Sequence, residues 1–452
     1  MPSRSVGSLS IRLSVVLAGL LTTGLAIGSA VSIAPAIELS ASAALLVLAL
    51  GVAVLEGATL LALATAMLRM RPTAARLPRP VSVLVAAWNE REGIVSTVRD
   101  LLAQTGVELE VIVADDGSTD GTGDRVEQVF GSDARVRLVR IGHAGKGPAL
   151  EAARAVARYP RIATVDADTV LEPLALAKLV AAIDGEVVAA GGAVLIDDTR
   201  TLGRRFQALE YLRTTWVRVA WAELGMLEQI PGAFSVFDAA ALASAGGFPV
   251  DSITEDYEVS YRLYEDAARR GRAIHIALVP EARAFTAPPD GFVGFVRQRT
   301  RWFAGFLSTL ARFRRLILWP RTGAFGMVRL PLKVLDAAGP LFAVSAMISL
   351  AVLLARGEVL SLLVLLPLGV RALSDVVIFL AGRAMAPNRE HGVGALLLTA
   401  IDAVTHGVVR QLVVLRAYPF AAARLATWER SRGPRVASTP TRTSSPHPEP
   451  AE

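Results

Sequence analysis

Hydrophobic residues are distributed unevenly along the chain, and their pattern divides it into four parts. Two long apolar runs open the sequence, from Leu13 to Ile33 and from Ala41 to Leu68. The first run has no charged residue, and the second has only Glu56. Each run is as long as the roughly 20 residues that a helix needs to cross a bilayer. The pattern therefore predicts a transmembrane helical hairpin within residues 1–79.

The first run has a second interpretation, as a secretory signal peptide with Arg4 and Arg12 as its basic start and a cleavage site near residues 26–30. The second run follows so closely that it favours the hairpin. Basic residues lie on the outer side of both runs, whereas the short connection between them has neither Lys nor Arg. Because positive residues stay on the cytoplasmic side, we expect the segment after Arg79 to be cytoplasmic.

From residue 80 to residue 315, short apolar runs alternate with helical patterns. The predicted strands are Val81–Ala86, Leu109–Ala114, Val136–Ile141, Ile162–Val165 and Ile274–Val279. The predicted helices cover residues 92–104, 121–130, 147–158 and 171–184. This alternation predicts an α/β domain with a Rossmann-like, mostly parallel sheet and helices on both faces. In such sheets, ligands bind at the carboxyl ends of the strands.

Beyond residue 315 the chain becomes apolar again, with spanning candidates at 334–355, 358–381 and 392–416. Residues 291–315 and 321–333 mix aromatic and basic residues, as helices at a membrane interface do. We therefore expect interfacial and transmembrane helices over 316–430 and a disordered, Pro-, Ser- and Thr-rich tail over 431–452. Three spans would place the tail outside, but the Arg residues that precede and begin it argue for the inside. A hidden span or a re-entrant run would resolve this conflict, and both alternatives stay open.

The composition agrees with a membrane-associated protein. Of 452 residues, 53% are hydrophobic, and the mean hydropathy of +0.47 is high for a soluble enzyme. The formal net charge of +6 suits an anionic lipid surface as well as nucleic acid. The chain has no cysteine, which excludes disulfides and thiolate chemistry and fits a cytosolic active site.

Acidic and polar residues lie where the first predicted strands end. The first strand runs into Asn89-Glu90, the second into Asp115-Asp116-Gly117-Ser118, and Gly145-Lys146-Gly147 opens a helix. Acids at a strand end can accept hydrogen bonds from a uracil imide or a ribose, and a Lys at a helix N-terminus suits a phosphate. The plainer alternatives are a helix N-cap formed by Ser118 or Asp120 and a solvated Lys146.

Two further acidic motifs suit metal binding and proton transfer. Asp166-Ala167-Asp168 follows a predicted strand, and carboxylates at i and i+2 can bind a divalent cation together with substrate phosphates. Thr254-Glu255-Asp256 can supply a base for an attacking hydroxyl, with Asp256 as first choice and Glu255 as second. The alternatives are a solvated acidic turn and a helix start capped by Thr254.

A basic and aromatic motif, Gln298-Arg299-Thr300-Arg301-Trp302, follows in a predicted helix. Gln298, Arg301 and Trp302 share one helical face. Arg301 can bind a diphosphate in bidentate fashion, and Trp302 offers a flat apolar surface to a sugar ring. For Arg299 and Phe303 we favour a role as anchors of an interfacial helix.

In this order and spacing, the motifs resemble those of the processive glycosyltransferases of family 2, which include cellulose, hyaluronan, chitin and poly-N-acetylglucosamine synthases. The resemblance runs from about Val81 to Gly305. Within the family it is greatest to the bacterial poly-β-1,6-N-acetylglucosamine synthases, through residues 251–256 and Trp428. It implies a GT-A fold, inversion at the anomeric carbon, a UDP-sugar donor, with UDP-N-acetylglucosamine as first choice, and a divalent Mg or Mn cofactor.

The resemblance also implies a role for each motif. The residues that would hold the donor are Glu90, Asp115, Asp116, Lys146, Asp166 and Arg301. Asp168 would bind the metal and Asp256 would be the catalytic base. The acceptor would contact Gln298, Trp302 and Ser235, the last within a loop over 231–235. We expect a polysaccharide acceptor and a lipid bilayer as partners and no nucleic acid, in the plasma membrane with a cytoplasmic catalytic domain; the oligomeric state stays open.

Two other functions compete with this interpretation. One is a non-processive transferase that modifies a lipid or a single acceptor sugar, and the other is a membrane transporter or scaffold. Charged residues in the apolar segments motivate the second: Glu56, Arg371, Asp375, Asp402, His406 and Arg410. Such residues either pair with one another or line a polar cavity. The second possibility would provide a channel for a sugar chain next to Trp302.

Overall fold

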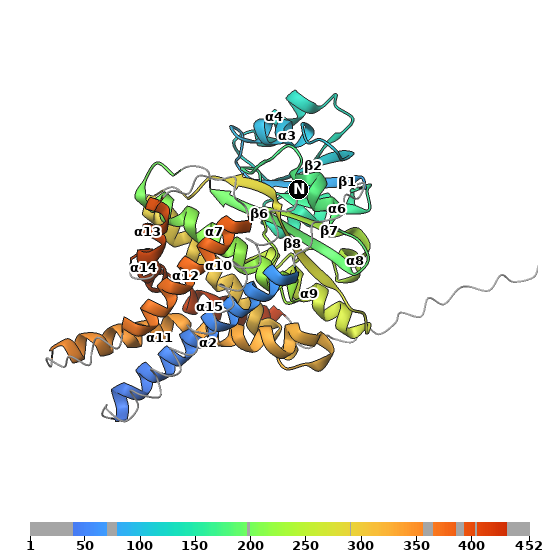
Figure 1. The fold of residues 1–452 in the computed structure, drawn as a ribbon. Helices are drawn as coiled ribbons and strands as arrows, with labels where there is room; N and C mark the ends of the chain where they lie inside the picture. Colours follow the sequence, from blue (N-terminus) through green and yellow to red (C-terminus); the bar gives the residue numbers. More distant parts are fainter. Residues whose placement is uncertain are drawn as a thin grey trace, which may run out of the picture.

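The computed structural model describes residues 39–69, 79–196, 199–289, 291–355, 365–385, 393–402 and 405–431. The first predicted span, residues 13–33, and the tail beyond residue 431 lie outside these ranges. Figure 1 shows a sheet with helices packed on it, and a helical region next to it that combines segments from both ends of the chain. These segments include α2 (Leu39–Arg69) and α11 (Leu330–Ala355).

The sheet has eight strands in the order β3-β2-β1-β4-β7-β6-β8-β5. Its strands are β1 (Val81–Ala87), β2 (Leu109–Asp116), β3 (Val136–Ile141), β4 (Arg161–Val165), β5 (Val170–Leu171), β6 (Val187–Ile196), β7 (Phe234–Asp238) and β8 (His275–Thr286). The pairs β1–β2, β1–β4, β2–β3 and β6–β8 are parallel, whereas β4–β7, β6–β7 and β5–β8 are antiparallel. The first half of the sheet therefore follows the Rossmann-like prediction, and β7 inserts antiparallel between β4 and β6.

Helices cover both faces of the sheet, because side chains on each strand alternate between two hydrophobic cores. In β1, Val81, Val83 and Val85 pack in one core, with α3 (Ile94–Leu102), α4 (Thr122–Phe130) and α6 (Ala175–Ala181). Leu84 packs in the other core. The helices on that second face are α5 (Lys146–Ala155), α7 (Leu202–Glu223), α8 (Ala239–Ser244), α9 (Glu255–Arg269) and α10 (Gly291–Arg312).

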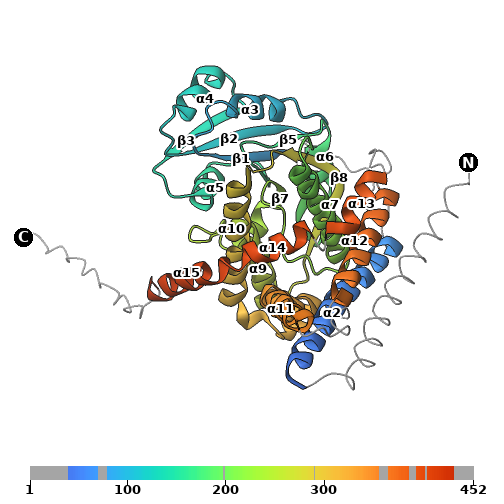
Figure 2. The same cartoon turned by 90° about the vertical axis from the view of Figure 1, so that its left-hand side faces the viewer.

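The C-terminal part is helical and packs beside α7, α9 and α10 (Figure 2). After α10 come three short helices, η2 (Arg314–Leu316), η3 (Pro320–Thr322) and the π-helix η4 (Phe325–Arg329). They lead into α11, α12 (Leu365–Met385), α13 (Val393–Asp402), α14 (His406–Val414) and α15 (Ala417–Ser431). The helix α2 packs against α7, α11 and α12, so a segment before the sheet lies among segments that follow it.

A network of buried charges joins this helical region to the sheet domain. Arg213 of α7 and Arg371 of α12 both bind Glu56 of α2, at 3.0 and 2.7 Å. Both arginines also pair with Asp375. Of the two explanations for charges in the apolar segments, the structure supports mutual pairing for these residues.

The flanking helices differ in length and apolar composition from single membrane spans. Within the described ranges, no single helix has both the length and the apolar composition to cross a bilayer. One bent pair, Gly394–Asp402 and His406–Leu425, does meet this criterion, with an angle of 41° between its halves. The spanning candidate over 392–416 is thus a bent helix pair rather than one straight helix, because α13 ends at Asp402 and α14 begins at His406. A re-entrant run was one of the two alternatives left open by the charge pattern.

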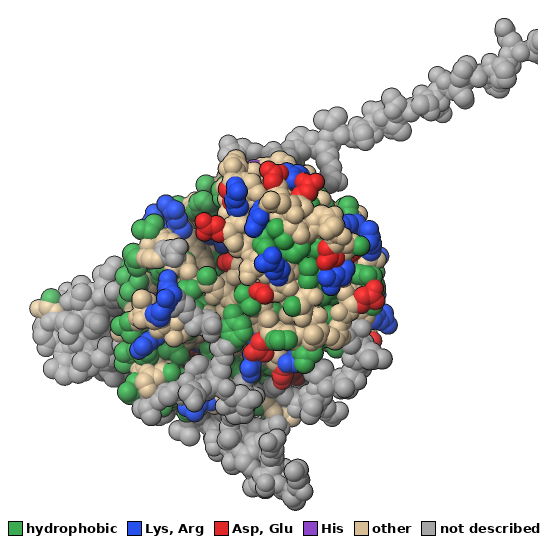
Figure 3. Space-filling model, turned by 90° about the horizontal axis from the view of Figure 1, so that it is seen from above, with side chains coloured by type: hydrophobic (Ala, Val, Ile, Leu, Met, Phe, Trp, Pro, Cys, Tyr) green, Lys and Arg blue, Asp and Glu red, His purple; other side chains and the backbone are tan. Residues whose placement is uncertain are grey.

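The end of the molecule that carries α3 and α4 exposes charged side chains of both signs among hydrophobic ones. In Figure 3, which looks down on this end, Lys and Arg side chains alternate with Asp and Glu. Arg140, for example, pairs with Asp124 and Glu127 at 2.8 Å each. Interspersed exposed charges of both signs are typical of a solvated surface.

Strand prediction was accurate where the apolar runs were short and clearly bounded. The predicted β1, β3 and β4 agree with the structure within one residue at each end. Three strands were not predicted, namely β5, β6 and β7, and the predicted helix over 171–184 is wrong at its start, where β5 lies. The short β5 pairs with β8, more than a hundred residues further along the chain, which no local pattern reveals.

Candidate active site

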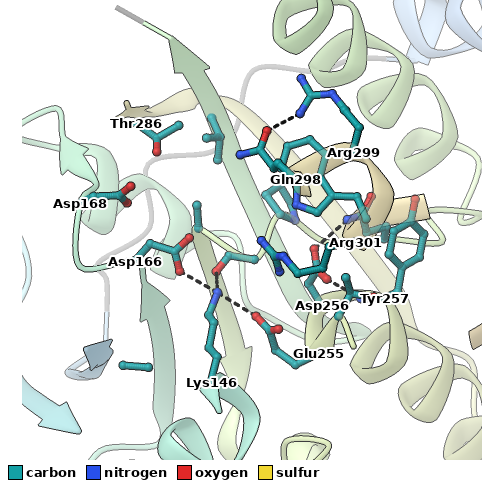
Figure 4. Close-up of a pocket in the computed structure, with 18 of the residues that line it drawn as sticks. Lys146, Asp166, Asp168, Glu255, Asp256, Tyr257, Thr286, Gln298, Arg299 and Arg301 are labelled. Atoms are coloured by element: carbon teal, nitrogen blue, oxygen red, sulfur yellow. Dashed lines mark hydrogen bonds and ion pairs between the residues drawn. The ribbon is translucent and has the colours of Figure 1, made fainter. Parts of the chain in front are cut away.

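A cavity of about 730 Å³ opens where the carboxyl ends of β1, β2 and β4 face α7, α9 and α10. Nine of the predicted site residues line it: Glu90, Asp116, Lys146, Asp166, Asp168, Asp256, Gln298, Arg301 and Trp302. Figure 4 shows the acidic residues from the sheet on one side of this space and the residues of α9 and α10 on the other. Asp115 and Ser235 lie outside the lining. The tertiary structure thus brings motifs from more than 200 residues of sequence to one place.

The turns after β1 and β2 are tied to each other by polar contacts. Asn89 has a positive φ of 56°, a conformation that Asn tolerates better than most residues. Its side-chain oxygen accepts a hydrogen bond from the Thr119 N–H at 2.9 Å, and its own N–H donates to Ser118 Oγ. The Glu90 N–H donates to Thr122 Oγ1 at 2.8 Å. These bonds fix Glu90 at the edge of the cavity.

The two acids at the end of β2 have different surroundings. Asp116 accepts hydrogen bonds from the N–H groups of Ala144 and Gly145, at 2.7 and 2.9 Å, and so shapes the loop before α5. His143 of the same loop stacks on Trp88, with ring centroids 4.7 Å apart. Together Trp88, Asp116 and His143 line one end of the cavity.

Asp115 faces α4 instead. Its carboxylate accepts the Ser118 N–H at 3.0 Å and is buried against Gly123, where an added Cβ would lie only 2.3 Å from Asp115 Oδ2. In this conformation Asp115 stabilises the turn rather than reaching the cavity. A direct contact between Asp115 and a donor stays a prediction.

Lys146 lies at the centre of the site. Its ammonium nitrogen is 2.6 Å from Asp166 Oδ1 and 2.7 Å from Glu255 Oε1, and it donates a hydrogen bond to the Gly232 carbonyl at 3.1 Å (Figure 4). Burial by itself lowers the pKa of Lys146, but the two carboxylates outweigh burial and raise its pKa above the ordinary value. Lys146 is therefore a fixed positive charge, and the interpretation as a solvated loop Lys is wrong.

Three carboxylates repel one another at the strand ends: Glu90 after β1, and Asp166 and Asp168 after β4. Burial, followed by the negative charge of Asp166, raises the pKa of Asp168. Burial, followed by the charge of Asp168, raises the pKa of Glu90 in the same way. Carboxylates that repel one another are a suitable environment for a cation, because a bound divalent ion would relieve the repulsion.

The described part of the chain does not by itself form a complete metal site. Among the described residues, no group of three or more His, Asp or Glu side chains is arranged to hold a metal ion. Mg²⁺ in nucleotide sites typically uses one or two carboxylates and takes its other ligands from phosphate oxygens and water. Asp168, with Asp166 beside it, fits that type of site.

The two acids at the start of α9, Glu255 and Asp256, have different electrostatic surroundings. Burial opposes ionisation of Glu255, but Lys146 outweighs burial and lowers the pKa of this carboxyl. Burial raises the pKa of Asp256, and the neighbouring charge of Glu255 raises it further. Asp256 accepts a hydrogen bond from Gln229 Nε2 at 2.7 Å. Glu255 is thus committed to an ion pair. Asp256 faces the cavity, has no cationic partner at contact distance among the residues that the structure describes, and has the raised pKa of a general base.

The helix α10 supplies the opposite wall, with Gln298, Arg301 and Trp302 as predicted. Arg299 differs from the prediction of an interfacial anchor, because its side chain is only 3% exposed and binds Glu210 Oε2 at 2.7 Å. Its guanidinium also lies 4.4 Å from the centre of the Trp302 ring. Arg299 therefore holds Trp302 in place, and an ion pair with α7 is what keeps its charge buried.

Ser235 is fully buried within β7, where its hydroxyl donates to the Pro231 carbonyl. Its side chain stabilises the turn that carries Gly232 and Ala233 to the cavity, rather than facing the cavity itself. Contact between Ser235 and an acceptor is thus not available in this conformation.

Several lining residues were not predicted from the sequence. They are Glu210, Tyr211 and Arg218 of α7, Gln229, and Tyr257 of α9. Arg410 of α14 also lines the cavity, and it is one of the charged residues for which the sequence predicts either pairing or a polar cavity. Gln229 lies two residues before the Pro231-Gly232 turn, which is a weak local signal. Those of α7 lie in a helix without a recognisable motif, and Arg410 reaches the cavity from the C-terminal region, 3.4 Å from Glu210.

Comparisons with known proteins agree with this arrangement. A family model described as "Glycosyltransferase like family 2" matches residues 78–305. Poly-beta-1,6-N-acetyl-D-glucosamine synthase of Staphylococcus aureus is 26% identical over 235 residues, which cover 51% of this chain and 56% of that protein. The enzyme of the same name from Staphylococcus epidermidis is 28% identical over 240 residues. The chain thus spans about half the length of the curated relatives it matches.

Among solved structures, a mannosyltransferase from Pyrobaculum calidifontis, in complex with GDP-Man and Mn²⁺, has a TM-score of 0.57 at 22% identity. The alignment covers 86% of this chain and 99% of that protein. At this identity the likeness shows the fold alone, which is the GT-A fold that the sequence motifs had implied.

The raised pKa of Asp256 predicts that its replacement by Asn stabilises the protein. The folded state binds the Asp256 proton more tightly than the unfolded chain, whose pKa is about 3.8, so stability is lost as pH rises from that value through the folded-state pKa. Asp256→Asn avoids this loss of stability, because an amide does not ionise. We expect a higher midpoint of thermal unfolding at pH 7, and a gain that shrinks as the pH is lowered toward 4.

Asp251→Asn is the matched control, for which we expect a change in unfolding midpoint of the opposite sign. Burial opposes ionisation of Asp251, but Arg312, 2.9 Å away, outweighs burial and lowers its pKa. The ionised form of Asp251 therefore stabilises the folded protein at pH 7, and its replacement should lower the unfolding midpoint. A similar fall for both variants at pH 7 would contradict the assignment of Asp256 as the unpaired carboxylate.

Proposed function

The chain belongs to the glycosyltransferase-like family 2, and we propose that it is a membrane-embedded, inverting enzyme that transfers N-acetylglucosamine from UDP-N-acetylglucosamine to a growing polysaccharide. The choice of this sugar rests on the name of the curated relatives, poly-beta-1,6-N-acetyl-D-glucosamine synthase. The family membership itself makes the chain a glycosyltransferase, and it does not favour the competing interpretation as a transporter or scaffold.

One observation carries the proposal. A single cavity contains an acidic cluster at the strand ends and a separate carboxylate, Asp256, on the opposite wall, with Lys146 between them. Glycosyl transfer needs both: a place for the charged diphosphate and its cation, and a base for the attacking hydroxyl. The volume of about 730 Å³ is in the range of cavities that enclose small-molecule ligands.

The donor would lie along the strand ends. Asp116, with the Trp88–His143 stack beside it, would face the base and ribose, while Lys146 and Arg301 would face the diphosphate. Asp168 would hold Mg²⁺ or Mn²⁺, with Asp166 in support, and the cation would supply charge neutralisation to the departing diphosphate. Lys146 can exchange one of its carboxylate contacts for a phosphate oxygen without losing its charge balance.

Asp256 would remove the proton from the attacking hydroxyl. The acceptor oxygen forms a bond to the anomeric carbon, the bond from that carbon to the diphosphate oxygen breaks, and UDP leaves with the electron pair. The proton ends on Asp256, on the face opposite the leaving group, which accounts for inversion. Trp302, held by Arg299, would offer its ring to the terminal sugar of the acceptor.

We propose further that the chain is anchored in the plasma membrane with its catalytic domain on the cytoplasmic side. The apolar runs before residue 69, the basic residues around them and the bent helix pair near the C-terminus support this topology. A processive enzyme with this topology would have to pass its product across the bilayer. Arg410 lines the cavity from that bent pair and marks the side on which such a product would leave.

The product identifies the reaction. Membranes that contain the chain are incubated with radiolabelled UDP-N-acetylglucosamine, UDP-glucose or GDP-mannose in separate reactions with Mg²⁺ or Mn²⁺. We expect label from UDP-N-acetylglucosamine alone to enter a high-molecular-weight product. Products with one added sugar, or label bound to lipid, would instead establish the non-processive alternative, and transfer from GDP-mannose would contradict the choice of nucleotide.

The absence of cysteine from the chain allows a clean test of sidedness. We expect Ala36→Cys, in the connection between the first two apolar runs, to react with a membrane-impermeant maleimide in intact cells. Gln128→Cys, on the exposed surface of α4, should react only after permeabilisation. The reverse pattern, or release of the protein by an alkaline carbonate wash, would contradict the membrane topology.

Replacement of the proposed metal ligand separates binding from folding. Asp168→Asn keeps the shape of the side chain but removes its charge, so we expect loss of turnover and of Mn²⁺-dependent donor binding, measured by calorimetry. Asp124→Asn, an exposed acid of α4, is the control and should leave both unchanged. Full activity of the wild-type protein in excess chelator would contradict metal dependence.

A further inference from the structure

Asp256 is the end of a three-residue hydrogen-bonded chain. Arg218 of α7 donates from Nη2 to Gln229 Oε1 at 2.7 Å, and Gln229 donates from Nε2 to Asp256 Oδ2 at 2.7 Å. All three side chains line the cavity. The second oxygen of Asp256, Oδ1, accepts the Tyr257 N–H at 3.0 Å, so each carboxylate oxygen has one fixed donor.

The chemistry of Arg218 decides how the Gln229 amide is oriented. A guanidinium has only donors, so the atom that faces it must be the amide oxygen. The amide NH₂ group is thereby left to face Asp256, where it can only donate. Gln229 would otherwise be free to rotate by 180° and present its oxygen to a carboxylate, which would be repulsive.

The backbone around Gln229 is held on both sides. The Ile230 N–H donates to Ser260 Oγ at 3.3 Å, and that hydroxyl donates to the Asp256 carbonyl at 3.1 Å. On the other side, the buried Glu228 forms a bidentate pair with Arg329 at 2.6 and 2.9 Å. Gln229 therefore sits in a segment that is fastened to α9 and to η4, which limits how far its side chain can drift from Asp256.

Titratable and charged groups from four helices lie around Asp256. Glu255 and Tyr257 belong to its own helix, Lys146 comes from α5, Arg218 from α7, and Arg301 from α10. Burial and Glu255 disfavour the ionised carboxylate, whereas Lys146, Gln229 and Arg218 favour it. Of these groups, Gln229 is the one outside α9 that donates a hydrogen bond to the Asp256 carboxylate.

We propose that Gln229 and Arg218 are positioning residues for the catalytic base: Arg218 orients the Gln229 amide, and Gln229 holds the Asp256 carboxylate ionised and aimed into the cavity. This inference rests on the proposed function, in which Asp256 receives the proton of the acceptor hydroxyl. Neither residue belongs to the acidic or aromatic motifs of the sequence. Their role follows from the contact geometry of α7, α9 and the segment between them.

The first experiment compares pH profiles of kcat/KM for sugar transfer. Gln229→Glu keeps an oxygen for Arg218 but places a second carboxyl 2.7 Å from Asp256, so the two acids must share a proton. We expect the acidic limb of the profile to move up by about one pH unit. The donor KM should stay near that of the wild type, and activity should recover as the pH is raised.

Variants of Arg218 test the orienting step. Arg218→Gln lets the amide of residue 229 rotate and should lower kcat about tenfold, at the lower end of what general-base catalysis contributes. Arg218→Lys retains a charged donor and should recover most of the activity. Arg205→Gln, the same substitution at an exposed position of α7, should behave as the wild type. Equal impairment by Arg218→Lys and Arg218→Gln, or an unmoved acidic limb in Gln229→Glu, would overturn the proposal.

A second experiment does not depend on activity. The change in unfolding midpoint caused by Asp256→Asn is measured at pH 7 in the wild-type and in the Gln229→Glu background. Because a second carboxylate adds repulsion, we expect the gain in stability to be larger in the Gln229→Glu background. An equal gain in both backgrounds would show that the two side chains do not interact, and would overturn the proposal.

The two experiments separate this inference from the proposed function. Asp256→Asn should lower kcat by about 10²–10⁴-fold while donor binding persists. If Asp256→Asn remains active and Glu255→Gln does not, the base has been assigned to the wrong carboxylate, and the proposal fails with it. If the wild-type protein transfers no sugar, the proposed function fails, and the stability cycle alone then decides whether Gln229 acts on Asp256.

Discussion

The site depends on one partly buried cation, the ammonium group of Lys146. The Lys146 ammonium lies between Asp166 at the end of β4 and Glu255 at the start of α9, and it also binds the carbonyl of Gly232. A buried charge is tolerated only where it is paired and hydrogen bonded. Lys146 therefore fixes three segments that are distant in sequence, and it joins the half of the cavity formed by the sheet to the half formed by the helices. Without it, two carboxylates would face each other across the site.

The other charged residues of the cavity also divide into those that have a partner of opposite charge and those that do not. Glu210 is largely buried, yet Arg299 and Arg410 lower its pKa to about 2, so its single negative charge is paired with two positive ones. Acids whose pKa is raised, Glu90, Asp168 and Asp256, are those without such a partner. The contrast separates paired carboxylates, which hold the structure together, from unpaired carboxylates, which are available to a cation or to a proton.

The helical region contributes to the site as well as to its surroundings. Arg410 of α14 lines the cavity, although it lies a hundred residues beyond the segment that matches the family. Arg329 of η4 pairs with Glu228 and stacks over Trp221 at 4.0 Å, which steadies the segment that carries Gln229. Breaking a buried pair of this type typically costs about 3–5 kcal/mol. The ion pairs around Glu56 join α2 and α12 to α7 in the same manner, so the catalytic domain and the flanking helices are one packed unit.

The sequence by itself determined the strands β1, β3 and β4, the family, and nine of the residues that line the cavity. These features are local: short apolar runs end in acids or glycine, and the motifs occur in a characteristic order. Only the tertiary structure decided that β7 inserts antiparallel next to β4, that Ser235 points into the core, and that Arg299 pairs with Glu210. It also decided which of Glu255 and Asp256 is paired, and that Gln229 and Arg218 reach Asp256. The physical reason is that a side chain's charge state and orientation depend on partners that packing brings together from distant segments, and a local pattern of residues contains no information about those partners.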